Sequence, residues 1–300
     1  KEKWLECHPG RHEEWFYLNY GMELQKRFFD HYLKGEKNGW NREPKVWINL
    51  RRPFTKEVEL RKESEWPLRG TKWSKLYLNA GGKGKLDWSA PKGKAKRKFR
   101  ALTRGVTWMS PPLRQETEIT GPMAAKLFVS SSTEDCDLFV TMQAVSPDGR
   151  EVYFQGTVDP KTPLAQGWLR ASHRKLDPTL SRPWRPYHTH DDKQLLTPST
   201  IYEVDVEIWP QCIVLPEGFR LALNISGKDY DRPGPSVAAY VPSRGSGPFL
   251  HDHPSDRPKE IFGGETTIHT GKGQESYLLL PIIPRRRGKP VKHDGSDAGV

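Results

Sequence analysis

Two apolar runs that alternate with a period of two lie near the middle of the chain. They are Ala124–Val129 and Leu138–Val145, and the polar segment Ser130–Asp137 separates them. Apolar side chains at every second position predict half-buried strands of an antiparallel sheet. The segment Ser146–Arg150 (SPDGR) then supplies Pro, Asp and Gly in the order of a turn, which predicts a return strand over Glu151–Gln155.

Short strand-like segments of the same kind follow one another along most of the chain. Pro and Gly separate them, and no helical period intervenes. This spacing predicts a mainly β protein, either a β-sandwich or a jelly roll. The other predicted strands are Val46–Leu50, Lys75–Leu78, Gly105–Met109, Gly167–Ser172, Ile201–Ile208, Arg220–Ser226, Thr266–His269 and Ser276–Leu280.

The first forty residues differ from this pattern. Lys3–Cys7 is a short apolar strand, and a loop with two histidines follows it. Residues 13–34 have apolar side chains near a 3.6-residue spacing, which predicts a helix with Gly35 as its C-cap. The polar linker Glu36–Pro44 then predicts a domain boundary.

Charge changes this description only locally. The net charge is +11, and much of the excess lies in Lys83–Arg104 and Arg285–Val300. The sequence predicts a mobile surface loop for the first and a disordered basic tail for the second. Stacking aromatic residues do not alternate with these charges, so we expect no nucleic-acid partner.

The remaining composition excludes several classes of protein. No apolar run approaches the roughly 18 residues of a membrane span and no signal peptide is visible, so we expect no membrane partner and a cytoplasmic location. Cys7, Cys136 and Cys212 have no metal-ligand spacing, and their odd number argues against a disulfide framework. Because the chain begins at Lys1, we expect it to be a piece of a longer protein.

Several phrases in fixed order resemble the C-terminal half of the cocaine-esterase-like and X-prolyl dipeptidyl-peptidase-like serine hydrolases, the CocE/NonD family. The resemblance runs from near residue 3 to about Pro284. It rests on KWLECHPGRHEEW, LQKRFFDHYLKGEKNGW, SEWPL, TGPMAAKLFVSSSTEDCDLFV, SPDGREVYFQG, PLAQGWLRASHRKLD, VDVEIWP and FGGETTIHTG.

This resemblance implies the domain organisation and the chemistry. Residues 1–40 would be the last strand and helix of an α/β-hydrolase domain, residues 44–284 a jelly-roll β-sandwich, and residues 285–300 the tail. The family cleaves esters or amides, including X-prolyl peptides, with a Ser–Asp–His triad that occurs in that chain order. It implies no cofactor and no metal, and a small ester, amide or short peptide as substrate.

The sequence contains only the histidine of such a triad. No GxSxG motif is present, and Gly245-Ser246-Gly247 has the wrong spacing. The nucleophile and the acid would therefore lie upstream, in a missing N-terminal hydrolase domain. By resemblance His12 is the first candidate for the catalytic histidine and His8 is the alternative. We expect a fragment that is inactive alone, and a homodimer stays open.

Several other features have plainer explanations. The pairs His188/His190 and His251/His253 have metal-ligand spacing, but polar turns explain them better, so no metal is expected. Asp135 and Asp137 are predicted to cap a loop, with Cys136 and Cys212 in the core. A Cys7 nucleophile is disfavoured because nothing in the sequence activates the thiol.

The alternative function is a stand-alone β-sandwich module that binds carbohydrate. It would use some of the scattered tryptophans, although their scatter favours ordinary packing. These are Trp66, Trp73, Trp88, Trp108, Trp168, Trp184 and Trp209.

Overall fold

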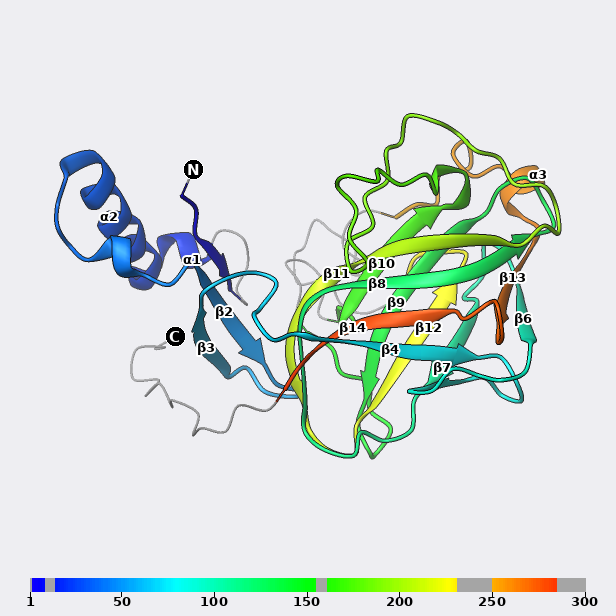
Figure 1. The fold of residues 1–300 in the computed structure, drawn as a ribbon, viewed down its shortest axis with the longest axis horizontal. Helices are drawn as coiled ribbons and strands as arrows, with labels where there is room; N and C mark the ends of the chain where they lie inside the picture. The colour runs from blue at the N-terminus through cyan, green and yellow to red at the C-terminus, as the bar shows by residue number, and fades with distance from the viewer. Residues whose placement is uncertain (1, 9–13, 155–160, 231–249, 285–300) are drawn as a thin grey trace.

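A computed structural model describes residues 2–8, 14–154, 161–230 and 250–284. Within these ranges the chain forms a β-sandwich with a small helical segment at one end (Figure 1). The helices are α1 (Glu14–Tyr17), α2 (Asn19–Lys34) and α3 (Lys259–Phe262). The strands are β1 (Leu5–Cys7), β2 (Val46–Arg51), β3 (Val58–Glu63), β4 (Lys72–Asn79), β5 (Lys85–Asp87), β6 (Ala95–Arg100), β7 (Val106–Met109), β8 (Thr117–Ser131), β9 (Asp137–Val145), β10 (Ala165–Arg170), β11 (Tyr202–Leu215), β12 (Arg220–Ser226), β13 (Glu265–Thr270) and β14 (Tyr277–Ile283).

The two apolar runs at the centre of the sequence become β8 and β9, which belong to different layers. Strand β8 pairs antiparallel with β11, β13 and β14, whereas β9 pairs antiparallel with β10 and β12. Leu127 on β8 and Leu138 and Met142 on β9 are fully buried in one core cluster. The predicted sandwich is therefore confirmed, and the side chains with period two are those that meet between its layers.

Burial in these strands is more complete than the sequence predicted. Ala124 on β8 and Phe139 on β9 belong to the opposite faces of their strands, and they are also buried, at 1% and 4% exposure. The half-buried strands of the prediction are therefore covered on both sides along much of their length.

Three local predictions were wrong or incomplete. The predicted helix is broken at Leu18 into α1 and α2, although Gly35 ends α2 in the left-handed conformation as expected (φ 70°). The return strand after the turn is reduced to isolated bridges at Glu151 and Phe154, and Gln155 lies outside the described residues. Strand β11 continues past the predicted end at Ile208 through a register shift, which accommodates Pro210.

The basic stretch Lys83–Arg104 is not a structureless loop. It contains β5 and β6, and β6 pairs along its whole length with β13. Phe99 is buried while Lys96 and Lys98 are exposed. The lysines alternate with inward side chains at the edge of a sheet, a common protection of edge strands. The predicted tail, residues 285–300, lies outside the described residues.

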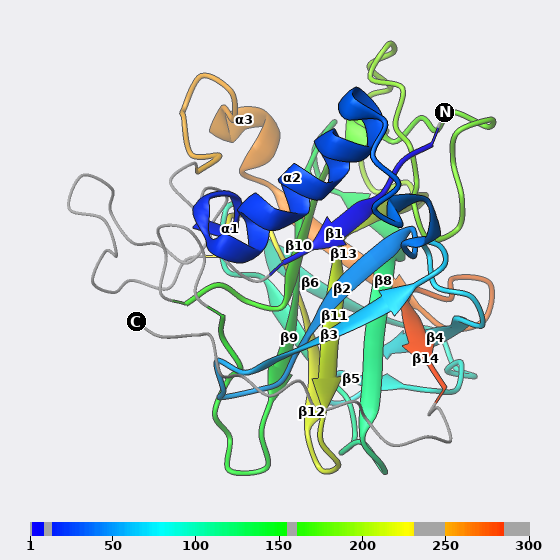
Figure 2. The same ribbon diagram turned by 90° about the vertical axis from the view of Figure 1, so that its left-hand side faces the viewer.

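The amino-terminal segment is joined to the sandwich by its backbone. Strand β1 pairs parallel with β2, which pairs with β3 and touches β11 at a single residue pair. Helix α2 runs alongside β1 (Figure 2). Its Phe28 contacts Trp4 and Trp40, with ring centroids 6.3 and 5.3 Å away. This aromatic cluster holds the helix against the start of the chain.

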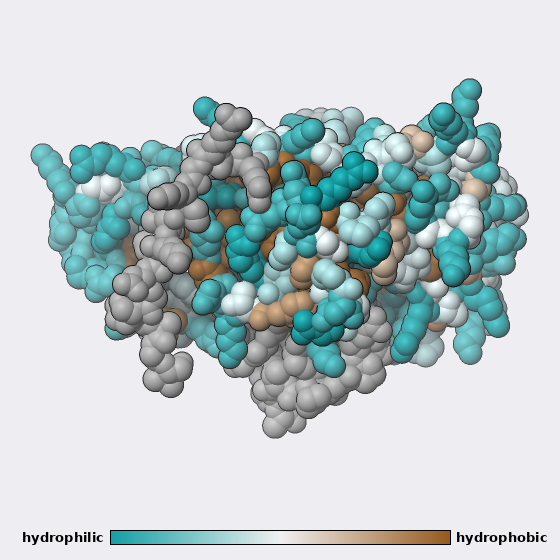
Figure 3. All heavy atoms as spheres, turned by 90° about the horizontal axis from the view of Figure 1, so that it is seen from below, coloured by the Kyte–Doolittle hydropathy of each residue, from teal (hydrophilic) through white to brown (hydrophobic). Residues whose placement is uncertain are grey.

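The surface agrees with the polar composition. Seen from below, it is mostly hydrophilic, with small hydrophobic areas between polar side chains (Figure 3). None of the helices in the described ranges has the length and apolar character needed to cross a membrane.

Candidate functional site

Of the two predicted catalytic histidines, the described residues include His8, at the end of β1. His12 is outside the described residues. His8 follows β1 directly, and its ring stacks on Trp15 of α1, with centroids 5.5 Å apart and planes 27° apart. The His8 Nδ1 atom is buried and finds no hydrogen-bond partner within the described ranges. His8 is therefore held by stacking, with one nitrogen that no described group orients.

The neighbouring thiol is not activated. Burial, and to a smaller extent the charge of Glu6, raises the pKa of Cys7. Burial also raises the pKa of Cys136 and of Cys212 to about 12 each. A thiol acts as a nucleophile in its thiolate form, so the three cysteines are unsuited to that role. Cys136 is 1% exposed, and its predicted place in the core is confirmed.

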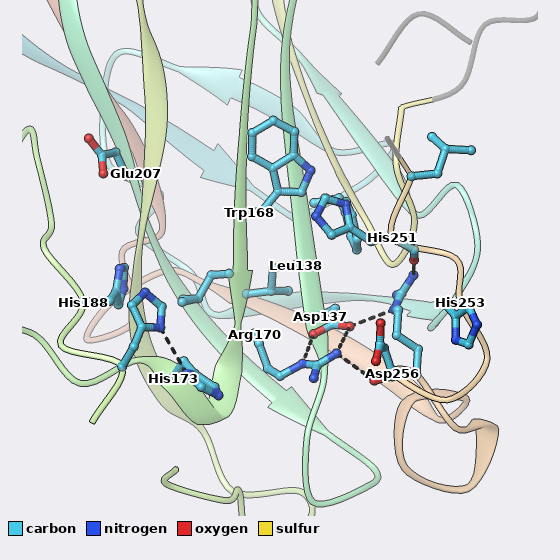
Figure 4. Close-up of a pocket in the computed structure, with 15 residues that line it drawn as sticks. Asp137, Leu138, Trp168, Arg170, His173, His188, Glu207, His251, His253 and Asp256 are labelled. Atoms are coloured by element: carbon cyan, nitrogen blue, oxygen red, sulfur yellow. Dashed lines mark hydrogen bonds and ion pairs between the residues drawn. The ribbon is translucent and has the colours of Figure 1, made fainter. Parts of the chain in front are cut away.

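A second site lies in the sandwich itself, at the end near α3. It is a pocket of about 560 Å³ between β9, β10, β11 and the loop that precedes α3 (Figure 4). We call it the histidine pocket after five histidines of its lining, which are His173, His188, His190, His251 and His253.

The base of the histidine pocket is an ion-pair cluster. Asp137 at the start of β9 accepts hydrogen bonds from Arg170 Nε at 2.8 Å and from Arg257 Nε at 2.8 Å. Arg257 also donates to the carbonyl oxygens of His251 (2.7 Å) and Gly227. Its three nitrogens are thus engaged, and they join the loop before α3 to the start of β9 and to the end of β12.

One wall of the pocket is aromatic and is fixed by a buried carboxylate. Asp229, whose side chain is 6% exposed, contacts Nδ1 of His251 at 3.0 Å and accepts from Trp168 Nε1 at 3.3 Å. The backbone N–H of His251 donates to the same carboxylate at 2.7 Å. The His251 ring also makes an edge contact with Phe139, with centroids 5.6 Å apart. Asp229 therefore sets the planes of both Trp168 and His251.

The opposite wall carries His173, His188 and His190 together with the carboxylate of Glu207. The Nδ1 atoms of His173 and His190 lie 3.1 Å apart. Burial, followed by the charge of His190, lowers the pKa of His188, whose Nε2 has no partner within the described residues. Glu207 on β11 is exposed, yet partial desolvation within the pocket raises its pKa. Burial on this wall therefore favours the neutral form of the His188 imidazole.

A glycine allows the two walls to approach. Gly167 on β10 lies against the backbone of Glu207 on β11, and a Cβ at position 167 would stand 2.1 Å from the Glu207 carbonyl oxygen. Only a residue without a side chain permits such contact. The next residue, Trp168, is thereby placed in the pocket.

The structure brings together residues that the sequence left in separate loops. The pairs His188/His190 and His251/His253 line one pocket. Within the described parts of the chain, no group of three or more His, Cys, Asp or Glu side chains is placed to hold a metal ion. Asp135 caps the loop as predicted, accepting from the backbone of Cys136 and Ser172. Asp137 does not, because two arginines occupy its carboxylate.

Sequence reasoning missed the other groups of this pocket. The sequence pattern gives Trp168 no more weight than the other tryptophans, and no motif marks Arg170, Glu207, Asp229 or Arg257. These residues lie on four different segments, from β10 to the loop before α3, and no local spacing links these segments.

Comparisons with known proteins place the chain in a family. The X-Pro dipeptidyl-peptidase C-terminal non-catalytic domain matches residues 38–279. Cocaine esterase of Rhodococcus sp. (strain MB1 Bresler) is 24% identical over 302 residues, covering 87% of this chain and 46% of that protein.

Solved structures agree. A CocE/NonD family hydrolase from Staphylococcus aureus superposes with a TM-score of 0.82 at 28% identity, covering 94% of this chain and 49% of the other. An aminopeptidase from a marine sediment Thaumarchaeota archaeon shares the fold, with a TM-score of 0.62 at 17% identity, over 92% of this chain and 45% of the other. The chain spans about half the length of the relatives that it matches. It belongs to the family of X-Pro dipeptidyl-peptidase C-terminal non-catalytic domains, the C-terminal region of CocE/NonD-type hydrolases.

Proposed function

We propose that this chain is the C-terminal part of a serine hydrolase that cleaves ester or amide bonds, X-prolyl peptide bonds included, through an acyl-enzyme. Residues 1–40 complete the hydrolase domain, and the sandwich forms a wall of the substrate cleft. His12 acts as the general base that takes the proton of an upstream serine, and His8 is the alternative. The serine and the acid lie in a preceding domain, so the chain alone is inactive.

The observation that carries this proposal is the outer side of the amino-terminal segment. Within the described residues β1 is the last strand in its sheet, with β2 as its neighbour. Helix α2 exposes a stripe of apolar side chains at spacings of seven and four residues, which lie on one face of a helix: Met22 is 48% exposed, Phe29 51% and Leu33 77%. A free strand edge beside an apolar helix face is suited to cover by more protein.

Chemistry within the chain also supports an upstream nucleophile. A serine hydrolase needs a hydroxyl, a base and a carboxylate in hydrogen-bond contact. His8 stands beside Cys7, whose raised pKa makes it a poor nucleophile. The matched family is moreover described as non-catalytic over residues 38–279. The reacting groups thus belong before residue 38 or upstream of the chain.

The test measures hydrolysis of a short-chain nitrophenyl ester. We expect no turnover above buffer by the 300-residue chain alone, and turnover when the chain is produced in one piece with the coding sequence that precedes it. In that longer protein His12→Ala should reduce kcat by a factor of about 10⁴ or more, and His8→Ala by less than tenfold. Turnover by the chain alone that His12→Ala abolishes would place a nucleophile inside these residues and overturn the proposal.

A further inference from the structure

We propose that the histidine pocket binds a neutral polyhydroxylated ligand, a sugar residue. This inference does not rest on the proposed hydrolase, because the whole pocket lies within the chain. Its volume of about 560 Å³ falls in the range of roughly 300–1,000 Å³ that is usual for small-molecule sites.

The charges of the lining argue against an anion. Apart from its imidazoles, the lining carries the carboxylates of Asp137, Glu207 and Asp256 against the guanidinium groups of Arg170 and Arg257. Recognition of phosphate or carboxylate uses a free, bidentate guanidinium. Both arginines instead bind Asp137, and the other two nitrogens of Arg257 donate hydrogen bonds to backbone carbonyl oxygens.

The hydrogen-bonding groups that remain are of both kinds. A guanidinium has five N–H donors, and Arg170 uses Nε and Nη2 for Asp137 and for the carbonyl oxygen of Asp256, which leaves Nη1 as a donor. The Asp229 carboxylate accepts from Nδ1–H of His251, so Nε2 is the ring nitrogen left for a ligand, and it accepts from a hydroxyl or donates to one according to its proton. Glu207 adds a carboxylate on the opposite wall. Hydroxyl groups both donate and accept, so a polyol satisfies such a mixed lining.

The aromatic wall supplies the other half of sugar recognition. Trp168 and His251 lie side by side, facing the wall of His173, His188 and Glu207 (Figure 4). Their planes are fixed by hydrogen bonds to Asp229, so little side-chain entropy is lost on binding. The C–H face of a pyranose ring packs against such rings, while its hydroxyls reach the polar groups.

The experiment is calorimetric titration of the 300-residue chain with glucose, galactose, mannose, xylose, N-acetylglucosamine, maltose and cellobiose, with ligand-observed NMR for weak binding. We expect at least one sugar to bind. Trp168→Ala should weaken its binding about tenfold or more, and Glu207→Gln about threefold or more. Glu207→Gln keeps the size of an exposed side chain, so it remains informative if Trp168→Ala fails to fold.

Matched controls are available within the chain. Glu203→Gln changes an exposed carboxylate on the same strand, β11, and Trp88→Ala removes an exposed tryptophan, both outside the pocket. Neither should change the affinity for the sugar. Binding of none of the sugars, or equal losses in Glu203→Gln and Glu207→Gln, would overturn the proposal. Two other results would also overturn it. If no sugar binds but choline binds through Trp168, the pocket is a cation site, and if no sugar binds but inorganic phosphate binds through Arg170, it is an anion site.

Discussion

Arg257 and Asp137 form an ion pair across 120 residues of sequence, with 2.8 Å between Nε and Oδ2. Their side chains are 7% and 9% exposed. The pair joins the loop before α3 to the start of β9, so it fixes the histidine pocket at its base. The contribution of this ion pair to the free energy of unfolding can be measured.

Arg257→Met should destabilise the protein by about 3 kcal/mol, because it leaves the buried carboxylate of Asp137 with Arg170 as its remaining described partner. Urea unfolding followed by circular dichroism measures the loss. The control is Arg150→Met, which breaks the exposed pair with Asp148 and should cost less than about 0.5 kcal/mol. Equal losses in the two variants would show that burial of the Arg257 pair has no special importance.

Gly167→Ala should destabilise the sandwich by about 2 kcal/mol, since the new Cβ collides with the Glu207 carbonyl oxygen and the two strands must separate. Gly93→Ala is the matched control, because a Cβ there meets no atom within 4 Å. Thermal unfolding of both variants decides the matter. A Gly167→Ala protein as stable as the control would mean that β10 does not need its close approach to β11.

Neighbouring phenylalanines on α2 should respond differently to truncation. Phe28→Ala removes contacts with Trp4 and Trp40 and should cost about 2 kcal/mol. Phe29→Ala changes a side chain that is 51% exposed and should cost less than about 0.5 kcal/mol. Hydrogen exchange of the α2 amides reports the difference directly. A larger loss for Phe29 would mean that the apolar stripe is already covered in the isolated chain.

Stability should fall as the pH drops from about 7.5 to 6. Burial, then the charges of His190 and His173, lowers the pKa of His188, and burial, then Lys96, lowers that of His269, from an ordinary value of 6.5. The unfolded chain therefore binds more protons in this range. The stability gained by keeping these two histidines neutral is fully present above their ordinary pKa of 6.5. It is lost as the pH falls through the lower pKa of the folded state.

The check is the free energy of unfolding at several pH values. His188→Gln should reduce the slope, and the double variant with His269→Gln should reduce it further. A wild-type profile that is flat or rises toward pH 6 would contradict the expected sign.

The sequence by itself determined the strands of the sandwich and the cap of its main helix. Alternating apolar residues such as Leu127 and Val129 mark an inward face wherever the strand pairs, because the period of two is a property of the strand itself. Gly35 ends α2 for a similarly local reason, since the left-handed conformation suits glycine. The family resemblance likewise rests on short local stretches of sequence.

The tertiary structure alone decided the partners of those elements. The many charges around Lys96 and Lys98 predict a surface loop. In the structure this segment is strand β6, because it pairs with β13. The sequence around Asp137 predicts a capping residue. In the structure its carboxylate instead binds Arg170 and Arg257, which come from distant segments. The histidine pocket arises in the same way, because its groups are far apart in sequence and meet only when the layers, loops and the close contact at Gly167 are in place.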